Sequence, residues 1–151
     1  MTDTTDRTAT KSGQRVLTGY RQKADTVYVY LSALFFAGVL VQVFLAGVGV
    51  FGINDLKIAD ASSFDPHRAW GSILMVISLV MLIVALIAWQ SRRTTISAFL
   101  LALLTVIAQN VLAALGDSNK WVGGLHALDG MLILLLSLWI AVLGWRRQRA
   151  R

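Results

Sequence analysis

The 151-residue sequence has no cysteine, no glutamate and a single proline, Pro66. Without cysteine the chain cannot form a disulfide, a thiolate metal site or the C-x-x-C-H attachment of c-type cytochromes. Without glutamate it has no H-E-x-x-H zinc motif, and it also lacks the glycine-rich loop that cradles nucleotide phosphates. These absences argue against a metallohydrolase and against a nucleotide-dependent enzyme.

Apolar residues are abundant instead. They make up 56% of the chain, with a mean hydropathy of +0.66, whereas soluble domains contain roughly 45–50%. A helix crosses the hydrocarbon core of a bilayer, roughly 30 Å thick, with about 20 apolar residues. Four runs are long enough, which predicts an all-α membrane protein with helices at about 27–52, 66–90, 95–116 and 121–145. We expect an up-down-up-down bundle of four transmembrane helices, surrounded by the lipid bilayer.

The basic residues indicate how the chain lies in its membrane. Residues 1–24 are polar and predict a disordered tail, and residues 147–151 predict a short basic tail. Eleven of the fourteen Lys and Arg residues fall in the N-terminal tail, the second connection and the C-terminus. The positive-inside rule then places both termini in the cytoplasm of a multi-pass protein of the cell membrane. The net charge of +6 flanks apolar runs, so nucleic acid is not an expected partner.

The only two histidines open similar stretches of sequence. Each is preceded by a glutamine and is followed, four and eleven residues later, by a glycine and a serine. The two sets are Gln42, His67, Gly71 and Ser78, and Gln109, His126, Gly130 and Ser137. The spacing of four and eleven keeps each glycine and serine on the helical face of its histidine. The pattern predicts a duplicated helical hairpin.

The two histidines are candidate ligands. In the predicted bundle they lie at matched shallow depth near the outer ends of the second and fourth helices. These two helices run in the same direction and occupy diagonal positions, about 13 Å apart. Such a gap would admit a flat cofactor or a metal between two imidazoles. Alternatively, the histidines are polar pins that hydrogen-bond between helices.

Glycines and glutamines near the histidines also have two interpretations. Gly71 and Gly130, one turn inward, would leave space for the edge of a porphyrin, or would serve close helix packing. Gln42 and Gln109 could line a cofactor pocket or hydrogen-bond across the bundle. The serines at the ends of the repeats are expected to bond to carbonyls of their own helices.

Charged groups near the predicted site are few. Asp65 and Pro66 predict the cap and first residue of the second helix. Arg68 is best placed to meet a haem propionate, if haem is bound there, and ordinary interfacial exposure is its other interpretation. Asp129 could orient the ring of His126 or pair with Arg68.

Three stretches resemble one four-helix half of the haem A synthase family: Asp65 to Gly71, Ala108 to Leu112 and Leu125 to Leu128. The resemblance implies that His67 and His126 ligate a b-type haem. It does not extend to haem hydroxylation, because this chain has one half instead of two, no glutamate before His67 and no loop cysteines. The chain also looks like small four-helix membrane proteins of unknown function.

Two hypotheses follow. The first is a membrane cytochrome or haem-handling protein; were it an enzyme, it would be a haem-dependent membrane oxidoreductase, although an enzyme is the less favoured interpretation. The second is a cofactor-free structural protein or assembly partner. A transition-metal or quinone site and a small-solute transporter are further alternatives. Glycine and alanine faces would allow a homodimer or contact with another membrane protein.

Overall fold

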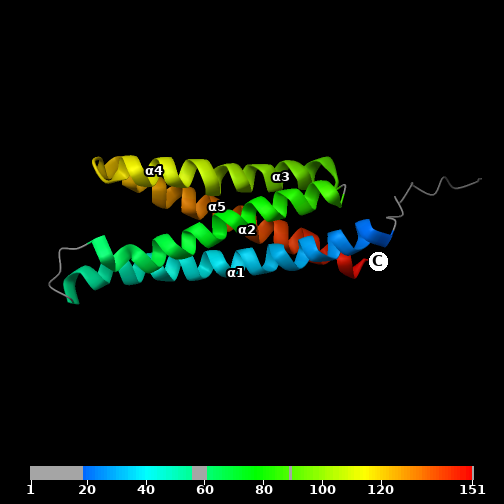
Figure 1. The fold of residues 1–151 in the computed structure, drawn as a ribbon, viewed down its shortest axis with the longest axis horizontal. Coiled ribbons are helices and arrows are strands. Elements are labelled where there is room, and N and C mark those ends of the chain that lie inside the picture. The colour runs from blue at the N-terminus through cyan, green and yellow to red at the C-terminus, as the bar shows by residue number, and fades with distance from the viewer. Residues whose placement is uncertain (1–18, 56–60, 89, 151) are drawn as a thin grey trace, which may run out of the picture.

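The computed structural model describes residues 19–55, 61–88 and 90–150 and is built of helices (Figure 1). The elements are α1 (Gly19–Asp55), η1 (Ala61–Phe64), α2 (Asp65–Ile87), α3 (Arg92–Leu103), η2 (Leu104–Ala108), α4 (Gln109–Gly116) and α5 (Lys120–Arg149). Helices α3 and α4 are joined through η2, one turn of π-helix, into one membrane-length helix. The described residues contain no β-strand, and the predicted all-α fold is confirmed.

Four helices are long and apolar enough to cross a membrane: 19–52, 65–87, 92–116 and 120–149. Their outward faces carry large apolar side chains, among them Phe44, Phe51 and Trp121. A bilayer solvates such faces, and a helix satisfies its own backbone hydrogen bonds inside the hydrocarbon. The chain is therefore a multi-pass integral membrane protein.

Each long helix begins at the end of the molecule where the preceding one finishes (Figure 1). Helix α1 packs against α2 and α5, while α2 also packs on α3 and α5 also packs on α4. Among the described residues, no Cα atom of α2 lies within 8 Å of one in α5. The second and fourth membrane helices are therefore diagonal to each other in the bundle. Descent from a duplicated hairpin stays a prediction.

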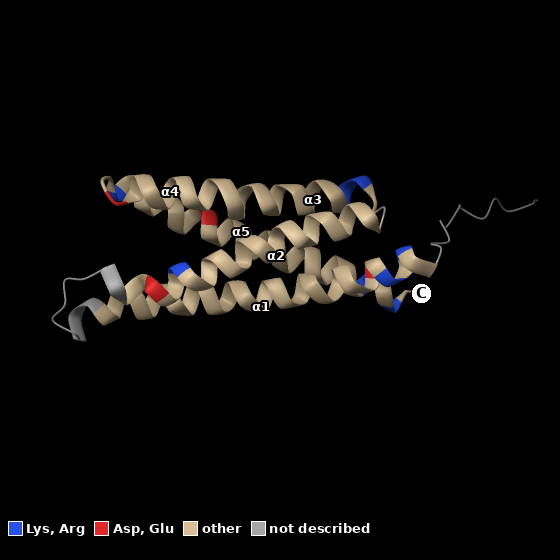
Figure 2. Cartoon of the chain, in the orientation of Figure 1, with Lys and Arg blue, Asp and Glu red and all other residues tan. Residues whose placement is uncertain are grey.

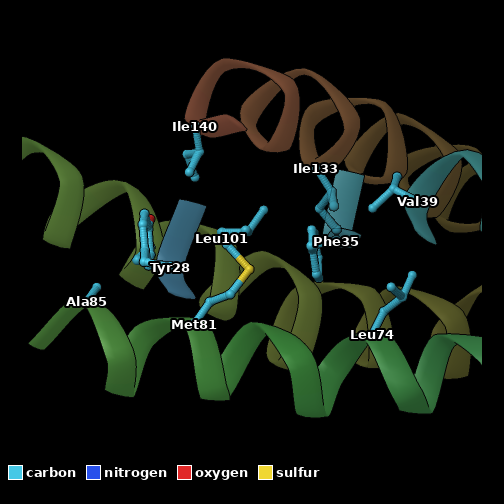
Figure 3. Close-up of a cluster of buried hydrophobic side chains, with 10 residues drawn as sticks. Tyr28, Phe35, Val39, Leu74, Met81, Ala85, Leu101, Ile133 and Ile140 are labelled. Carbon is cyan, nitrogen blue, oxygen red and sulfur yellow. The ribbon is translucent and has the colours of Figure 1, made fainter. Parts of the chain in front are cut away.

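The core lies along the middle of the bundle and draws on all four membrane helices. Phe35, Met81, Leu101, Ile133 and Ile140 point toward one another there (Figure 3). All five are at least 95% buried. In a bilayer the gain comes from close contact between side chains, because lipid tails are as apolar as the core.

The close approach of α1 and α2 depends on Gly38. The indole Nε1 of Trp70 donates a hydrogen bond of 2.8 Å to the carbonyl oxygen of Gly38. A Cβ atom on Gly38 would lie 2.7 Å from Cδ2 of Leu74. Gly47, on the same helix, has no neighbour within 4 Å of such an atom, so of these two glycines it is Gly38 that serves helix packing.

The helix ends differ from those that the apolar runs predict. Helix α1 begins at Gly19 and includes residues 19–24 of the predicted tail, while residues 1–18 of that tail lie outside the described part. Helix α5 continues to Arg149, through most of the predicted basic tail. Helix α2 ends at Ile87, and its cap is Phe64, with no side-chain hydrogen bond. Asp65 is therefore the first helical residue and not the cap.

Buried polar contacts explain the two extensions. Asp25 is only 1% exposed and lies 3.5 Å from Nη2 of Arg147. Gln90 donates to Oδ1 of Asp25 and accepts a 2.7 Å bond from Nη1 of Arg147. Gln148 donates to Oδ2 of Asp25. Both helices continue beyond their apolar runs because these contacts join the start of α1 to the end of α5.

Candidate functional site

The two histidines meet between diagonal helices. His67 lies in the first turn of α2, and His126 lies two turns into α5. Their ring centroids are 6.4 Å apart, with an angle of 69° between the ring planes. Both rings are half-buried. Residues 59 positions apart in the sequence thus form a single cluster.

His67 and Gln42 are linked by reciprocal hydrogen bonds between α2 and α1. Nδ1 of His67 donates to the backbone oxygen of Gln42 at 3.2 Å. In return, Nε2 of Gln42 donates to the backbone oxygen of His67 at 3.1 Å. The same amide nitrogen lies 3.1 Å from Nε2 of His67. The glutamine therefore holds both the ring and the backbone of the histidine.

The second half of the chain repeats this arrangement. Nδ1 of His126 donates to the backbone oxygen of Gln109 at 3.1 Å, and the Gln109 amide donates to the backbone oxygen of His126, also at 3.1 Å. Deeper in each helix, the predicted serine bonds are present. Ser78 donates to the carbonyl of Met75, and Ser137 donates to that of Leu134.

These bonds fix the tautomer of both imidazole rings. A backbone oxygen only accepts, so Nδ1 of each histidine must carry the proton in each bond. In a neutral imidazole the lone pair then resides on Nε2, which is the state that binds a metal. Helix-bound carbonyls also restrict rotation of the rings, the usual arrangement around metal-binding histidines. The site offers two oriented Nε2 atoms.

Gly71 and Gly130 make room for the glutamine amides. A Cβ atom on Gly71 would lie 3.0 Å from Nε2 of Gln42, and one on Gly130 would lie 3.6 Å from Nε2 of Gln109. The space over each glycine, predicted for a porphyrin edge or for helix packing, is thus filled by an amide. The cause is that each glutamine side chain points inward and its amide bonds to the backbone of the following helix.

The glutamine amide lies closer to Gly71 than to Gly130, so the same substitution at the two positions should have different effects. We expect Gly71→Ala to cost about 1 kcal/mol more than Gly130→Ala, because the methyl group at position 71 overpacks the Gln42 amide. The gain in helix propensity is the same for both. Unfolding by SDS in mixed micelles measures the difference. Equal free energies of unfolding for the two variants would contradict this account.

The two charged candidate residues, Arg68 and Asp129, differ in exposure and in their partners. Arg68 forms an exposed ion pair of 3.4 Å with Asp65, so its role toward a cofactor stays a prediction. Asp129 is only 6% exposed, and within the described part of the chain its Oδ2 has no hydrogen-bond partner. The equivalent position of the first repeat is Trp70. The two halves share their histidine contacts but not this carboxylate.

The donor set limits what the site can hold. The described residues contain no group of three or more His, Asp, Glu or Cys side chains able to surround a metal ion. A bare transition-metal ion usually needs at least three protein ligands. Two imidazoles are sufficient for a group that brings its own equatorial ligands, such as haem iron. By themselves, the two imidazoles are therefore too few ligands for a free metal ion.

Sequence reasoning missed two features of the bundle, and the first of them adjoins the site. One is the π-turn η2, which ends directly before Gln109 and adds a residue to that turn. Asn110 donates to the carbonyl of Val106 within it, at 2.8 Å. The other is the buried network around Asp25. Its polar side chains were a visible signal, whereas the π-turn has no sequence signature.

Residues 42–115 match the sequence profile of a family described as a family of unknown function (DUF6220). The matched region begins at Gln42, contains His67 and Gln109, and stops before His126. Neither a curated protein nor a solved structure gives a significant match to the chain. Over 74 of its 151 residues, just under half of the chain, the sequence is similar to a family to which no function is assigned.

Proposed function

We propose that this membrane protein binds one b-type haem between α2 and α5, and that His67 and His126 would hold it. One observation carries the proposal: two imidazoles from diagonal helices approach to 6.4 Å, each with Nδ1 bonded to a backbone carbonyl. The resemblance to one half of the haem A synthase family supports the same ligand pair.

The spacing of the rings suits a shared metal ion. Two imidazole nitrogens, each about 2 Å from one metal ion, leave the ring centroids roughly 6 Å apart. The angle between the rings is unrestricted, because each ring plane contains its own metal–nitrogen bond. Nε2 of His67 would bind in place of its contact with the Gln42 amide, which retains its bond to the His67 backbone oxygen.

A haem held by these two histidines would supply one-electron chemistry. Electron transfer or haem carriage is therefore the proposed role. The residues of this chain would hold the ring nitrogens, keep their tautomer and exclude bulk water. With both termini in the cytoplasm of a cell-membrane protein, the site lies near the outer surface.

A cofactor-free role is the second candidate, and one observation favours it. The reciprocal Gln–His bonds satisfy polar groups inside the bundle without any ligand. Such pins between membrane helices contribute about 0.6–2 kcal/mol each. The protein would then be a structural or assembly partner, either of itself or of another membrane protein.

Absorption spectroscopy separates the two candidates. The protein is purified in mild detergent from haem-replete cells, and an oxidised-minus-reduced spectrum is recorded together with the haem-to-protein ratio. Sharp low-spin b-type bands at about one haem per chain are expected. A flat spectrum that persists after titration with added haem would reject the haem site and favour the cofactor-free role.

A further inference from the structure

The seam between α1 and α5 opens into a hollow near the start of α1. Its lining residues are Thr26, Val29, Tyr30, Trp145, Gln148 and Arg149. At its inner side α1 and α5 pack closely: a Cβ atom on Gly144 would lie 3.1 Å from Cγ2 of Val29. The hollow is thus bounded on its inner side by tight helix contact.

Aromatic rings form the wall of this hollow. Tyr30 and Trp145 meet edge to face, with centroids 6.3 Å apart and ring planes at 86°. Cζ of Arg149 lies 5.7 Å from the centroid of the Trp145 ring. Tyr30 is 63% exposed and Trp145 is 43% exposed. Exposed Tyr and Trp near the ends of apolar runs are typical of the headgroup level of a bilayer.

The polar groups around the hollow differ in whether they are free to bind a ligand. Both amide hydrogens of Gln148 are engaged, because Nε2 donates to Asp25 and to Thr26. The Thr26 hydroxyl donates to the backbone oxygen of Gln22. Arg149 has no ion pair within the part of the chain that the structure describes. Its guanidinium is therefore the group that can receive an anion.

Charge at this end of the bundle favours an anion as well. Figure 2 shows basic residues gathered where α1 starts and α5 ends. The described basic residues are Arg21 and Lys23 at the start of α1, Arg92 and Arg93 at the start of α3, and Arg146, Arg147 and Arg149 at the end of α5. Asp25, the acidic residue among them, is paired with Arg147. Basic pockets between membrane helices bind acidic lipid headgroups.

We propose that this hollow, here called the α1/α5 hollow, binds the phosphate of an anionic phospholipid. Arg149 pairs with the phosphate, and the Tyr30 and Trp145 rings contact the glycerol and the start of an acyl chain. The apolar wall decides between a lipid and a free phosphate ion, because a free ion would gain nothing from it. The proposal is independent of haem.

Native mass spectrometry of the full chain tests this proposal. The protein is released from nanodiscs that contain equal amounts of phosphatidylglycerol and phosphatidylcholine, and retained lipids are counted. Phosphatidylglycerol is expected to be retained preferentially. Arg149→Gln should lower its retention about fivefold, the effect of one basic residue at a membrane surface. Trp145→Leu should lower it as well, although the net charge is unchanged.

Arg92→Gln is the matched control, because it removes the same charge at the same end of the bundle but away from the hollow. We expect it to change retention less than twofold. Equal losses for Arg92→Gln and Arg149→Gln would indicate diffuse attraction and overturn the site. Displacement of the lipid by millimolar inorganic phosphate would indicate a small-anion site and would overturn it too. Size-exclusion profiles and circular dichroism confirm that each variant is folded.

Discussion

Replacing either His67 or His126 with alanine is expected to lower haem content from about one per chain to nearly none and to remove the low-spin spectrum. Each ring supplies one of only two protein ligands, and the described residues contain no further donor cluster that could replace it. Pyridine haemochrome assay and absorption spectra of the purified variants measure the loss. Full haem content in both variants would contradict the proposed ligand pair.

Misfolding could mimic this loss, so the experiment needs a rescue. Added imidazole should enter the space left in His126→Ala and restore the low-spin bands without restoring the link to Gln109. Gln109→Leu is the complementary variant, because it keeps the backbone oxygen that accepts from His126. It should retain haem with an affinity about 10-fold lower or more, as for other groups that orient metal ligands.

Replacing Asp25 with alanine is expected to lower the free energy of unfolding by about 3 kcal/mol. Asp25 is 1% exposed and accepts bonds from Gln90, Arg147 and Gln148. Its removal leaves a guanidinium and two amides without their acceptor. The expected cost is at the low end for a buried pair, because the Arg147 side chain is 34% exposed. SDS titration in mixed micelles measures it.

Asp65→Ala is the control for this prediction. Asp65 also pairs with an arginine, Arg68, but both side chains are more than half exposed. Its loss should cost less than about 1 kcal/mol. In a double-mutant cycle, Asp25→Ala combined with Arg147→Ala should cost less than the sum of the single variants. Additive costs would show that the two residues do not interact.

The sequence by itself determined that four helices span a membrane. A chain inside hydrocarbon must satisfy every backbone hydrogen bond internally, so each apolar run of about 20 residues becomes a helix whatever its neighbours are. The repeat of Gln42, His67 and Gly71 as Gln109, His126 and Gly130 also selected the residues that converge. Both results depend on local period and composition, which can be read without coordinates.

The tertiary structure decided the helix ends and the contacts within the site. Helices α1 and α5 extend past their apolar runs because Asp25 meets Arg147, 122 residues away. The glycines accommodate the glutamine amides, since each glutamine turns toward the following helix. The π-turn before Gln109 changes the register of that helix. Contacts between distant segments govern the helix ends and the glycine contacts, and spacing along one helix cannot reveal where a second helix places its side chains.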